Sequence, residues 1–291
     1  MVAFGTDTNR APDATTAALP RAAAQRAERI ERLAWHDIVR AAGPLGAELG
    51  LEAENRDGAL ILRARHLDSL LFNRVIGLAT DGPVSERTVA AIPESYARRA
   101  IRRYWIHVSA HARSHGLEAQ LDAQGFARYP RSWMKFLRGV EEFSARPSSL
   151  DVRPARPSDA DEIAAIVGPA FDLPEPGGRL FANVTGRSGW HVYVATDAER
   201  IVAAGALFVA GELGYHAFAA TRPEDRGRGA QSLLMQVRIG KARALGCRWL
   251  ATETGAPQSA DEANPSYQNI LRCGFQPADL RANYGLPGTK W

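Results

Sequence analysis

A short stretch rich in glycine and arginine carries the clearest chemical signal in the chain. Within residues 221–232 it contains Arg226, Gly227, Arg228 and Gly229. An apolar run precedes the stretch and a helical pattern follows it, so the glycines lie between a strand and a helix N-terminus. Backbone N–H groups and the positive end of the helix dipole meet at such a point, which suits a phosphate. The glycines lack a Cβ, so a ligand can approach the backbone closely, and the guanidinium groups add positive charge.

Two well-known nucleotide-binding motifs differ from this loop. A Walker A loop requires Gly-Lys-Ser/Thr, which does not follow these glycines. A dinucleotide-binding fingerprint requires G-x-G-x-x-G, and Ser232 replaces its third glycine. Glu253 stands at about the distance of a ribose-binding acid, which leaves this interpretation open. Against it, a charged segment with a proline separates the loop from its strand, and too little chain follows for a doubly wound sheet.

The segment Arg226–Ala230 resembles the acyl-CoA pyrophosphate loop of the GNAT acetyltransferase superfamily, whose pattern is Arg/Gln-x-x-Gly-x-Gly/Ala. The last position of the pattern is Gln231 in this chain, which is a departure. A second block, Asn264–Phe275, resembles the fourth helix of the superfamily, which ends in Gly-Phe. Both blocks occur in the expected order and spacing, so the region from about residue 150 to residue 284 is similar to a GNAT domain.

The resemblance implies acetyl-CoA as co-substrate and no metal. In the superfamily the strand before the loop splays from its neighbour, and its backbone holds the pantetheine arm like an added strand. The implied cofactor-binding residues lie on the strand end, the loop and the last helix: Ala219, Ala220, Thr221, Arg226, Gly227, Arg228, Gly229, Ala230, Gln231, Ser232, Asn264 and Asn269. Asn264 is equally suited to be the N-cap of its helix.

The implied chemistry is attack of an amine on the thioester, with a base, an oxyanion donor and an acid for the leaving thiolate. Two habitual catalytic positions are non-standard: Tyr215 stands where several members have a glutamate base, and Ile270 stands where many have a tyrosine acid. The candidate substitutes are Tyr215 itself, Glu253 and Tyr267. Tyr267 is equally suited to core packing, and Glu253 to capping the turn at Gly255 or binding the substrate amine.

The composition excludes several other classes of protein. The 291 residues are 45% hydrophobic and 23% charged, which is normal for a globular protein with a sizeable core. The net charge of +4 comes without a long basic run or zinc-finger spacing, so we expect no nucleic-acid partner. No run approaches the roughly 18 apolar residues of a membrane span, and no secretory signal is evident. Cys247 and Cys273 lie in apolar patterns, which favours buried reduced thiols and a cytoplasmic protein.

The chain divides into two halves. Residues 1–20 are rich in Ala, Thr, Asp and Pro and predict a disordered tail. Residues 144–149 predict a linker between a first domain, 21–143, and a second domain, 150–291. The expected fold class is α/β (α+β), with a mixed, mainly antiparallel sheet flanked by helices in each half.

The two halves look like a degenerate repeat. Leu121–Phe126 parallels Ile270–Phe275, because each ends in Gly-Phe and precedes a final strand. A glycine loop in the first half would fall at residues 79–84, where Asp81 would repel a pyrophosphate and Pro83 has no N–H to donate. We therefore expect one cofactor site, in the second half, with the first half shaping the acceptor pocket or bracing the fold. The open alternative is that the first half is another kind of α/β domain.

Hydrophobic periodicity and turn residues predict most of the elements. Expected helices are Arg21–Ala42, with Arg and Glu on its polar face, Ser85–Arg103, Leu117–Gln124, one capped by Ser158, and those after residues 229 and 264. Expected strands are Ala59–Ala64, Phe72–Leu78, Tyr104–Val108, Ser132–Arg138, His191–Ala195, Ile201–Val209, Gly214–Ala220 and Arg248–Thr252. A loop rich in Pro and Gly is expected at Asp172–Gly178.

Three histidines recur every four residues. His107, His111 and His115 would line one face of a continuous helix and could there bind zinc. The strand expected at Tyr104–Val108 and the break at Gly116 interrupt such a helix. We therefore expect solvated or singly bonded histidines and no metal site.

These observations predict a cytoplasmic N-acetyltransferase, monomeric or homodimeric, that moves an acetyl group from acetyl-CoA to a primary amine of a small molecule or peptide. The alternative is a non-catalytic acyl-CoA-binding or sensing protein, which the non-standard acid and base positions favour. A third interpretation is a nucleotide-binding domain of another kind. Turnover separates the first two, and ligand preference separates both from the third.

Overall fold

The computed structural model describes residues 21–259 and 261–289; the tail predicted at residues 1–20 lies outside them. The helices are α1 (Arg21–Ala41), α2 (Pro44–Glu48), α3 (Glu86–Ala97), α4 (Ala110–Ser114), α5 (Leu117–Ala123), α6 (Ala160–Ala170), α7 (Glu175–Ala182), α8 (Ala230–Ala244) and α9 (Pro265–Arg272). The strands are β1 (Leu51–Arg56), β2 (Ala59–Ala64), β3 (Arg74–Ile76), β4 (Trp105–Val108), β5 (Ala127–Arg128), β6 (Trp133–Arg138), β7 (Asp151–Pro154), β8 (Trp190–Asp197), β9 (Arg200–Ala210), β10 (Leu213–Thr221), β11 (Trp249–Gly255) and β12 (Gln276–Gly285). None of these helices is long and apolar enough to cross a membrane.

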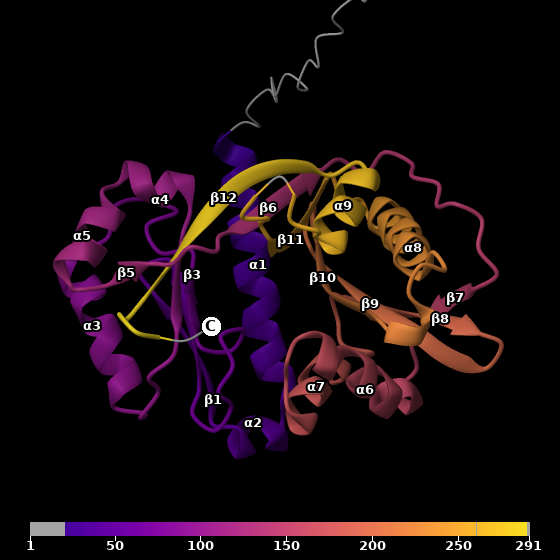
Figure 1. Cartoon of the computed structure of the whole chain (residues 1–291), viewed down its shortest axis with the longest axis horizontal. Helices are drawn as coiled ribbons and strands as arrows, with labels where there is room; N and C mark the ends of the chain where they lie inside the picture. The colour runs from indigo at the N-terminus through magenta and orange to yellow at the C-terminus, as the bar shows by residue number, and fades with distance from the viewer. Residues whose placement is uncertain (1–20, 260, 290–291) are drawn as a thin grey trace, which may run out of the picture.

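The strands form one sheet through both halves of the molecule (Figure 1). Their order is β1-β2-β3-β4-β12-β6-β11-β10-β9-β8-β7, with β5 beside β12. The pairs β3–β4 and β10–β11 are parallel, and the other described pairs are antiparallel. The expected class, a mixed and mainly antiparallel sheet flanked by helices, is confirmed.

The two halves exchange their last strands. Strand β6 belongs to the first half in sequence, yet it lies between β11 and β12, where Lys135 is opposite both Glu253 and Asp279. The end of β12 in turn lies between β4 and β5, with Asn283 opposite His107. The two halves are therefore consecutive in the sequence but interleaved in the sheet. Their division at residues 144–149 stays a prediction.

The expected repeat is visible where each half ends its last helix. Gly125 and Gly274 have φ of +78° and +80°. The Phe126 N–H donates to the Leu121 carbonyl at 3.0 Å, and the Phe275 N–H donates to the Ile270 carbonyl at 3.3 Å. Both Gly-Phe pairs thus form the same left-handed helix end, in which only glycine takes the positive φ without strain.

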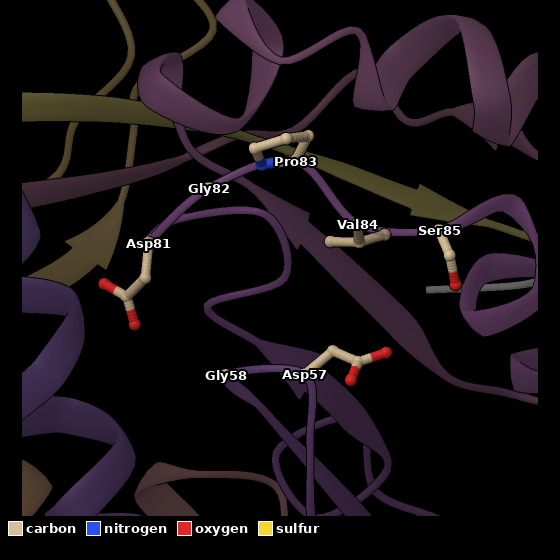
Figure 2. A pocket seen from close by; sticks show the side chains of 7 residues that line it. All are labelled: Asp57, Gly58, Asp81, Gly82, Pro83, Val84 and Ser85. Atoms are coloured by element: carbon tan, nitrogen blue, oxygen red, sulfur yellow. The ribbon is translucent and has the colours of Figure 1, made fainter.

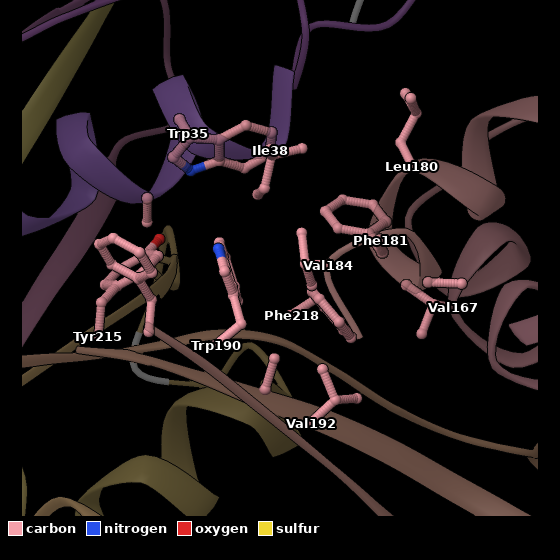
Figure 3. Packing of buried hydrophobic residues seen from close by; sticks show 14 of the residues in the cluster. Trp35, Ile38, Val167, Leu180, Phe181, Val184, Trp190, Val192, Tyr215 and Phe218 are labelled. Carbon is pink, nitrogen blue, oxygen red and sulfur yellow. The ribbon is translucent and has the colours of Figure 1, made fainter. Parts of the chain in front are cut away.

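The long helix α1 runs through the middle of the molecule, between the two halves (Figure 1). One face of the sheet packs against α1, α6 and α7, and the other face packs against α3 to α5 in the first half and α8 and α9 in the second. Figure 3 shows Trp35 of α1 and Phe181 of α7 above Phe218 of β10. The ring centroids of Trp35 and Phe181 are 6.0 Å apart, and those of Phe181 and Phe218 are 4.9 Å apart. Aromatic packing therefore fixes α1 on the second half.

Two local predictions were wrong in the second half. Helix α6 begins at Ala160, and Ser158 does not cap it, because Ser158 lies inside the preceding 3-10 turn Pro157–Asp159 and Asp159 occupies the N-cap position. The loop predicted at Asp172–Gly178 turns helical at Glu175, where α7 begins. A Cβ on Gly178 would lie 2.6 Å from the Ala164 carbonyl oxygen, so this glycine serves close helix packing rather than a loop.

Candidate functional site

Strands β10 and β11 separate at the centre of the second half. They pair only from Leu213 to Tyr215, and the Thr252 hydroxyl then donates to the His216 carbonyl at 3.1 Å. Strand β10 also carries a bulge, because its register with β9 shifts between His216 and Ala219. From Ala219 onward β10 is paired with β9 alone, so its other edge lies open toward β11. Such an edge can accept an extended ligand as an added strand.

The glycine-rich loop joins this open edge to α8. Gly227 and Gly229 have φ of +82° and +90°, a region that residues with a Cβ rarely adopt. Gly229 is the N-cap of the 15-residue helix α8 and provides no side-chain cap for its first N–H groups. No atom lies within 4 Å of a Cβ built on Gly227. The loop therefore presents uncapped amides and open space, which fit the phosphate groups of a CoA molecule.

The two arginines of the loop have different surroundings. Arg228 donates to Asp197 and to Asp225, both at 2.8 Å, and these hydrogen bonds raise the pKa of its guanidinium. The positive charge of Arg228 is thus already paired with two carboxylates of the chain itself. Arg226 is exposed, and no described carboxylate forms an ion pair with it. Arg226 is therefore the loop cation that remains available to an anionic ligand.

Gln231, at the position where the loop pattern has Gly or Ala, reaches back to the strand. Its side-chain amide donates to the Thr221 hydroxyl at 2.8 Å. The Ser148 hydroxyl donates to the Arg228 carbonyl at 2.7 Å, which fixes the predicted linker against the loop. Ala230 is buried and Ser232 is half-buried at the start of α8. These contacts order the loop without capping the amides that it presents.

The corresponding loop of the first half lines a pocket of about 460 Å³ (Figure 2). Asp57 and Asp81 border this pocket, and Pro83 has no N–H to donate. The Ser85 hydroxyl caps α3 by accepting the Thr88 N–H at 3.2 Å. In contrast to α8, this helix start is capped by its own side chain and borders carboxylates, which disfavours a phosphate.

The candidate catalytic residues fall on both faces of the sheet. The Tyr215 hydroxyl donates to Glu253 Oε1 at 3.0 Å, on the face covered by α1. Tyr267 of α9 packs on the opposite face, with its ring centroid 5.0 Å from that of Phe136. Burial raises the pKa of Tyr267, so this half-buried hydroxyl holds its proton. The structure thus brings Tyr215 and Glu253 together and places Tyr267 apart from them.

The two asparagines of the last block have local partners. Asn264 is the N-cap of α9, since its side chain accepts the Tyr267 N–H at 2.9 Å and donates to the Gly255 carbonyl at 2.7 Å. Asn269 accepts a hydrogen bond from Arg272. The capping interpretation of Asn264 therefore holds, and a contact of either side chain with a cofactor stays a prediction.

A buried charge cluster surrounds Glu253. It joins three carboxylates with three cations, all with side chains at most 8% exposed: Glu28, Glu31, Glu253, Arg74, Lys135 and Arg281. Lys135 Nζ lies 2.6 Å from Glu31 and 3.1 Å from Glu253. Arg281 pairs with Glu31 at 2.7 Å and also with Glu253. The formal charges balance, as burial requires, and the members come from α1, β3, β6, β11 and β12.

This cluster sets the protonation of the candidate pair. Burial opposes the charge of Glu253, but Arg281, Lys135 and Arg74 together hold the pKa of its carboxyl well below the usual range. Burial and the neighbouring Glu253 charge raise the pKa of Tyr215 well above its usual value. Glu253 is thus ionised, and it accepts the hydrogen bond of a Tyr215 hydroxyl that keeps its proton. Such a carboxylate takes up a proton poorly, so it is better suited to position charge than to act as a base.

Arg74 of the charge cluster also belongs to a chain of hydrogen bonds with His107 of the first half and Asn283 of the exchanged strand β12. Arg74 Nη1 donates to His107 Nε2 at 3.1 Å, and His107 Nδ1 donates to Asn283 Oδ1 at 2.7 Å. His107 faces Asn283 in the sheet as Glu253 faces Lys135. Burial, with Arg281 and Arg74, lowers the pKa of His107 well below its usual range, so the ring is neutral. The prediction of a singly bonded histidine was therefore wrong at this position.

The other two histidines lie away from this chain of hydrogen bonds. His111 and His115 lie 3.2 Å apart at α4. Within residues 21–259 and 261–289, no group of three or more His, Cys, Asp or Glu is arranged to hold a metal.

The sequence interpretation missed five of the six cluster members. It assigned the Glu residues of the first helix to a polar face, although Glu28 and Glu31 are buried. The usable signal was a charged residue in the middle of an apolar strand, as at Arg74 and Lys135. Such a residue is rarely buried unless it is paired, so each one indicates a partner elsewhere in the chain.

Comparisons with known proteins identify the architecture. No protein-family model and no curated protein matches the chain. A GCN5-related N-acetyltransferase from Kribbella flavida matches 90% of this chain and 96% of its own, with 17% identity and a TM-score of 0.60. A tandem GNAT protein from the clavulanic acid biosynthesis pathway matches 91% of this chain and 94% of its own, with 13% identity and a TM-score of 0.55. The chain has the tandem GNAT fold.

A third GNAT structure agrees with this assignment. The GCN5-related N-acetyltransferase from Sphaerobacter thermophilus covers 92% of this chain and 93% of its own, with 16% identity and a TM-score of 0.55. These three structures confirm the predicted tandem GNAT fold. In this GNAT fold, the open edge of β10 and the uncapped start of α8 lie in the second half, where the motifs predicted them.

Proposed function

We propose that the chain is an N-acetyltransferase that binds acetyl-CoA in its second half and acetylates a primary amine of a small molecule or peptide. The uncapped N-terminus of α8, directly beside the open edge of β10, carries this proposal. The helix start offers an anion site for the pyrophosphate of CoA, and the adjoining strand edge offers backbone groups that can pair with the pantetheine arm. The GNAT fold, which this chain shares with two GCN5-related N-acetyltransferases, supports the same activity.

The proposed binding mode follows the path from β10 to α8. The pyrophosphate would lie on the amides of residues 227–232, with Arg226 as its cation. The pantetheine arm would pair with the backbone of Ala219, Ala220 and Thr221. Asn264 and Asn269 would approach the same arm from α9. Gln231 would keep its hydrogen bond to Thr221 and so hold the loop against the strand.

The proposed transfer joins the acceptor nitrogen to the acetyl carbon. As the C–N bond forms, the carbonyl electron pair moves onto oxygen, and it returns as the C–S bond breaks. The amine proton passes to water, and Tyr267 donates a proton to the leaving thiolate and regains one from water. Tyr267 suits this role because burial keeps its hydroxyl protonated. Tyr215 and Glu253 would act as a positioning pair on the acceptor side of the strands.

We also propose a single cofactor site and a cytoplasmic location. The loop of the first half borders Asp57 and Asp81 and starts a capped helix, so it offers no anion site of this kind. Cys247 and Cys273 are both free and buried, which is typical of a reducing compartment. The first half would brace the acceptor side through α1 and the exchanged strand β6.

Turnover and ligand preference test the proposal together. Acetyl-CoA at 100 times its Kd should stabilise the chain by about 2.7 kcal/mol, a Tm shift of a few degrees, whereas NAD should not. A panel of primary amines should then give acetylated products in mass spectra and free thiol in equal amounts. Binding of acetyl-CoA without turnover on any amine would favour the sensing alternative. Stabilisation by NAD alone would overturn the acetyl-CoA assignment.

A further inference from the structure

Helix α8 carries a fully buried arginine, on the face of the sheet opposite the charge cluster. The Arg238 side chain is 0% exposed. Its Nε donates to the Leu234 carbonyl at 3.0 Å, and its Nη1 donates to the Ala206 carbonyl at 3.1 Å. Its Nη2 has no hydrogen-bond partner, and none of the carboxylates in the described part of the chain pairs with it. This is a buried cation without a counter-ion.

The guanidinium of Arg238 lies at the bulge of β10. The β9 partner of His216 is Leu207 and that of Ala219 is Gly205, so Ala206 alone faces the two bulged residues between them. The Ala206 carbonyl is the one that accepts Arg238 Nη1. A Cβ on Gly205 would lie 3.1 Å from Arg238 Cζ, so the glycine makes room for the guanidinium. Arg238 therefore supports the sheet where β10 leaves β11.

Packing alone does not account for a charge at this position. Burying an ion costs several kcal/mol, and an apolar side chain of similar size would be more stable there. The neighbouring His216 is also buried, and its Nε2 has no hydrogen-bond partner among the residues that the structure describes. Burial, with Arg238 and Arg138, lowers the pKa of His216 well below its usual range, so its ring is neutral. The region thus carries unmatched positive charge beside the separation of the two strands.

We propose that Arg238 is a positioning residue for acetyl transfer, which holds the bulge through Ala206 and places its charge beneath the thioester. This inference rests on the proposed function. The bulged backbone between His216 and Ala219 would then present an N–H to the carbonyl oxygen, and the guanidinium would stabilise the negative charge that forms there during attack. Arg238 takes and gives no proton. Bulges next to active sites commonly redirect backbone groups in this way.

Arg238→Met tests the proposal, because methionine keeps the length and removes the charge. We expect kcat to fall about 10- to 100-fold, while the Kd and KM for acetyl-CoA stay within about twofold. The Tm should stay equal or rise, because an unpaired buried charge is lost. Arg238→Lys keeps the charge without the guanidinium fork and should recover part of kcat. Arg243→Met, at an exposed arginine of the same helix, is the matched control and should change neither kcat nor Tm.

A lower Tm with unchanged kcat in Arg238→Met would overturn the inference and make Arg238 purely structural. If that variant does not fold, Arg238→Lys decides: the inference predicts reduced kcat at normal Kd and Tm, and a wild-type kcat refutes it. A wild-type chain that binds no acetyl-CoA would overturn the proposed function itself, and the inference with it. If the wild-type chain binds acetyl-CoA and turns over normally, but the Arg238 variants keep the wild-type kcat, the inference alone is overturned.

Discussion

Replacing Gly229 by aspartate places a negative charge at the proposed pyrophosphate site. The nearest atom to a Cβ at this position is the Ser148 Cβ at 3.5 Å, so the side chain fits without a clash. The φ of +90° costs an L-residue about 1–2 kcal/mol, which lowers stability but not the fold. A carboxylate about 4 Å from a phosphate repels it by about 1 kcal/mol in water and about 4 kcal/mol at an effective dielectric constant of 20. Binding of CoA should therefore weaken by about 5- to 1000-fold.

Gly246→Asp is the matched control for this variant. Gly246 has φ of +79° and open space around its Cβ position, so the substitution imposes a similar backbone strain. It lies just beyond the other end of α8, a 15-residue helix about 22 Å long by helix rise. Calorimetric titration with CoA should give a wild-type Kd for Gly246→Asp and a weakened Kd for Gly229→Asp, with the difference shrinking at high salt. Equal Kd values for both variants would refute the assignment of the loop.

Two further perturbations test the chemistry and the charge cluster. Tyr267→Phe should lower kcat at least tenfold with an unchanged Kd for acetyl-CoA, because the ring stays packed on Phe136 while the proton donor is lost; wild-type turnover would remove Tyr267 from the mechanism. Burial raises the pKa of Glu28 from 4.5 to about 6, so the folded state holds this proton more tightly than the unfolded state does. The resulting stability is complete below pH 4.5 and is lost as the pH rises through 6, by on the order of 2 kcal/mol. Chemical denaturation of Glu28→Gln across this window should show a flatter pH dependence than the wild-type chain, and identical slopes would contradict the shift.

Local sequence signals predicted the parts of the fold that depend on neighbouring residues. The helix start at Ser85 and the helix end at Gly274 follow from the chemistry of a few neighbouring residues, and both are present. The glycine loop was predictable for the same reason. Strand, loop and helix follow one another within a short stretch of the chain, so their order alone places Gly229 at the helix start.

The error at α7 shows where local signals mislead. Glycine and proline favour a loop when only neighbouring residues are considered. Here Pro174 precedes the helix as its N-cap, and Gly178 allows the close approach of α6. The residue that Gly178 approaches, Ala164, lies 14 positions earlier in the chain, so a pattern of neighbouring residues does not predict this contact.

The sequence pattern did not predict the exchange of β6 and β12 between the two halves. The composition of β6 predicts a strand but does not specify the neighbour with which that strand pairs. The charge cluster depends on that pairing, because Lys135 meets Glu253 only when β6 lies beside β11. The sequence therefore named Tyr215 and Glu253 as separate candidates, but it showed neither their hydrogen bond nor the cations that set the protonation of Glu253.

Calorimetric titration of the wild-type chain with acetyl-CoA tests the central claim most directly. We expect saturable binding of one molecule per chain, because among residues 21–259 and 261–289 the second half alone combines an open strand edge with the uncapped start of α8. Absence of binding would contradict the assignment of the loop as a CoA site, and two molecules per chain would contradict the proposal of a single site in the second half.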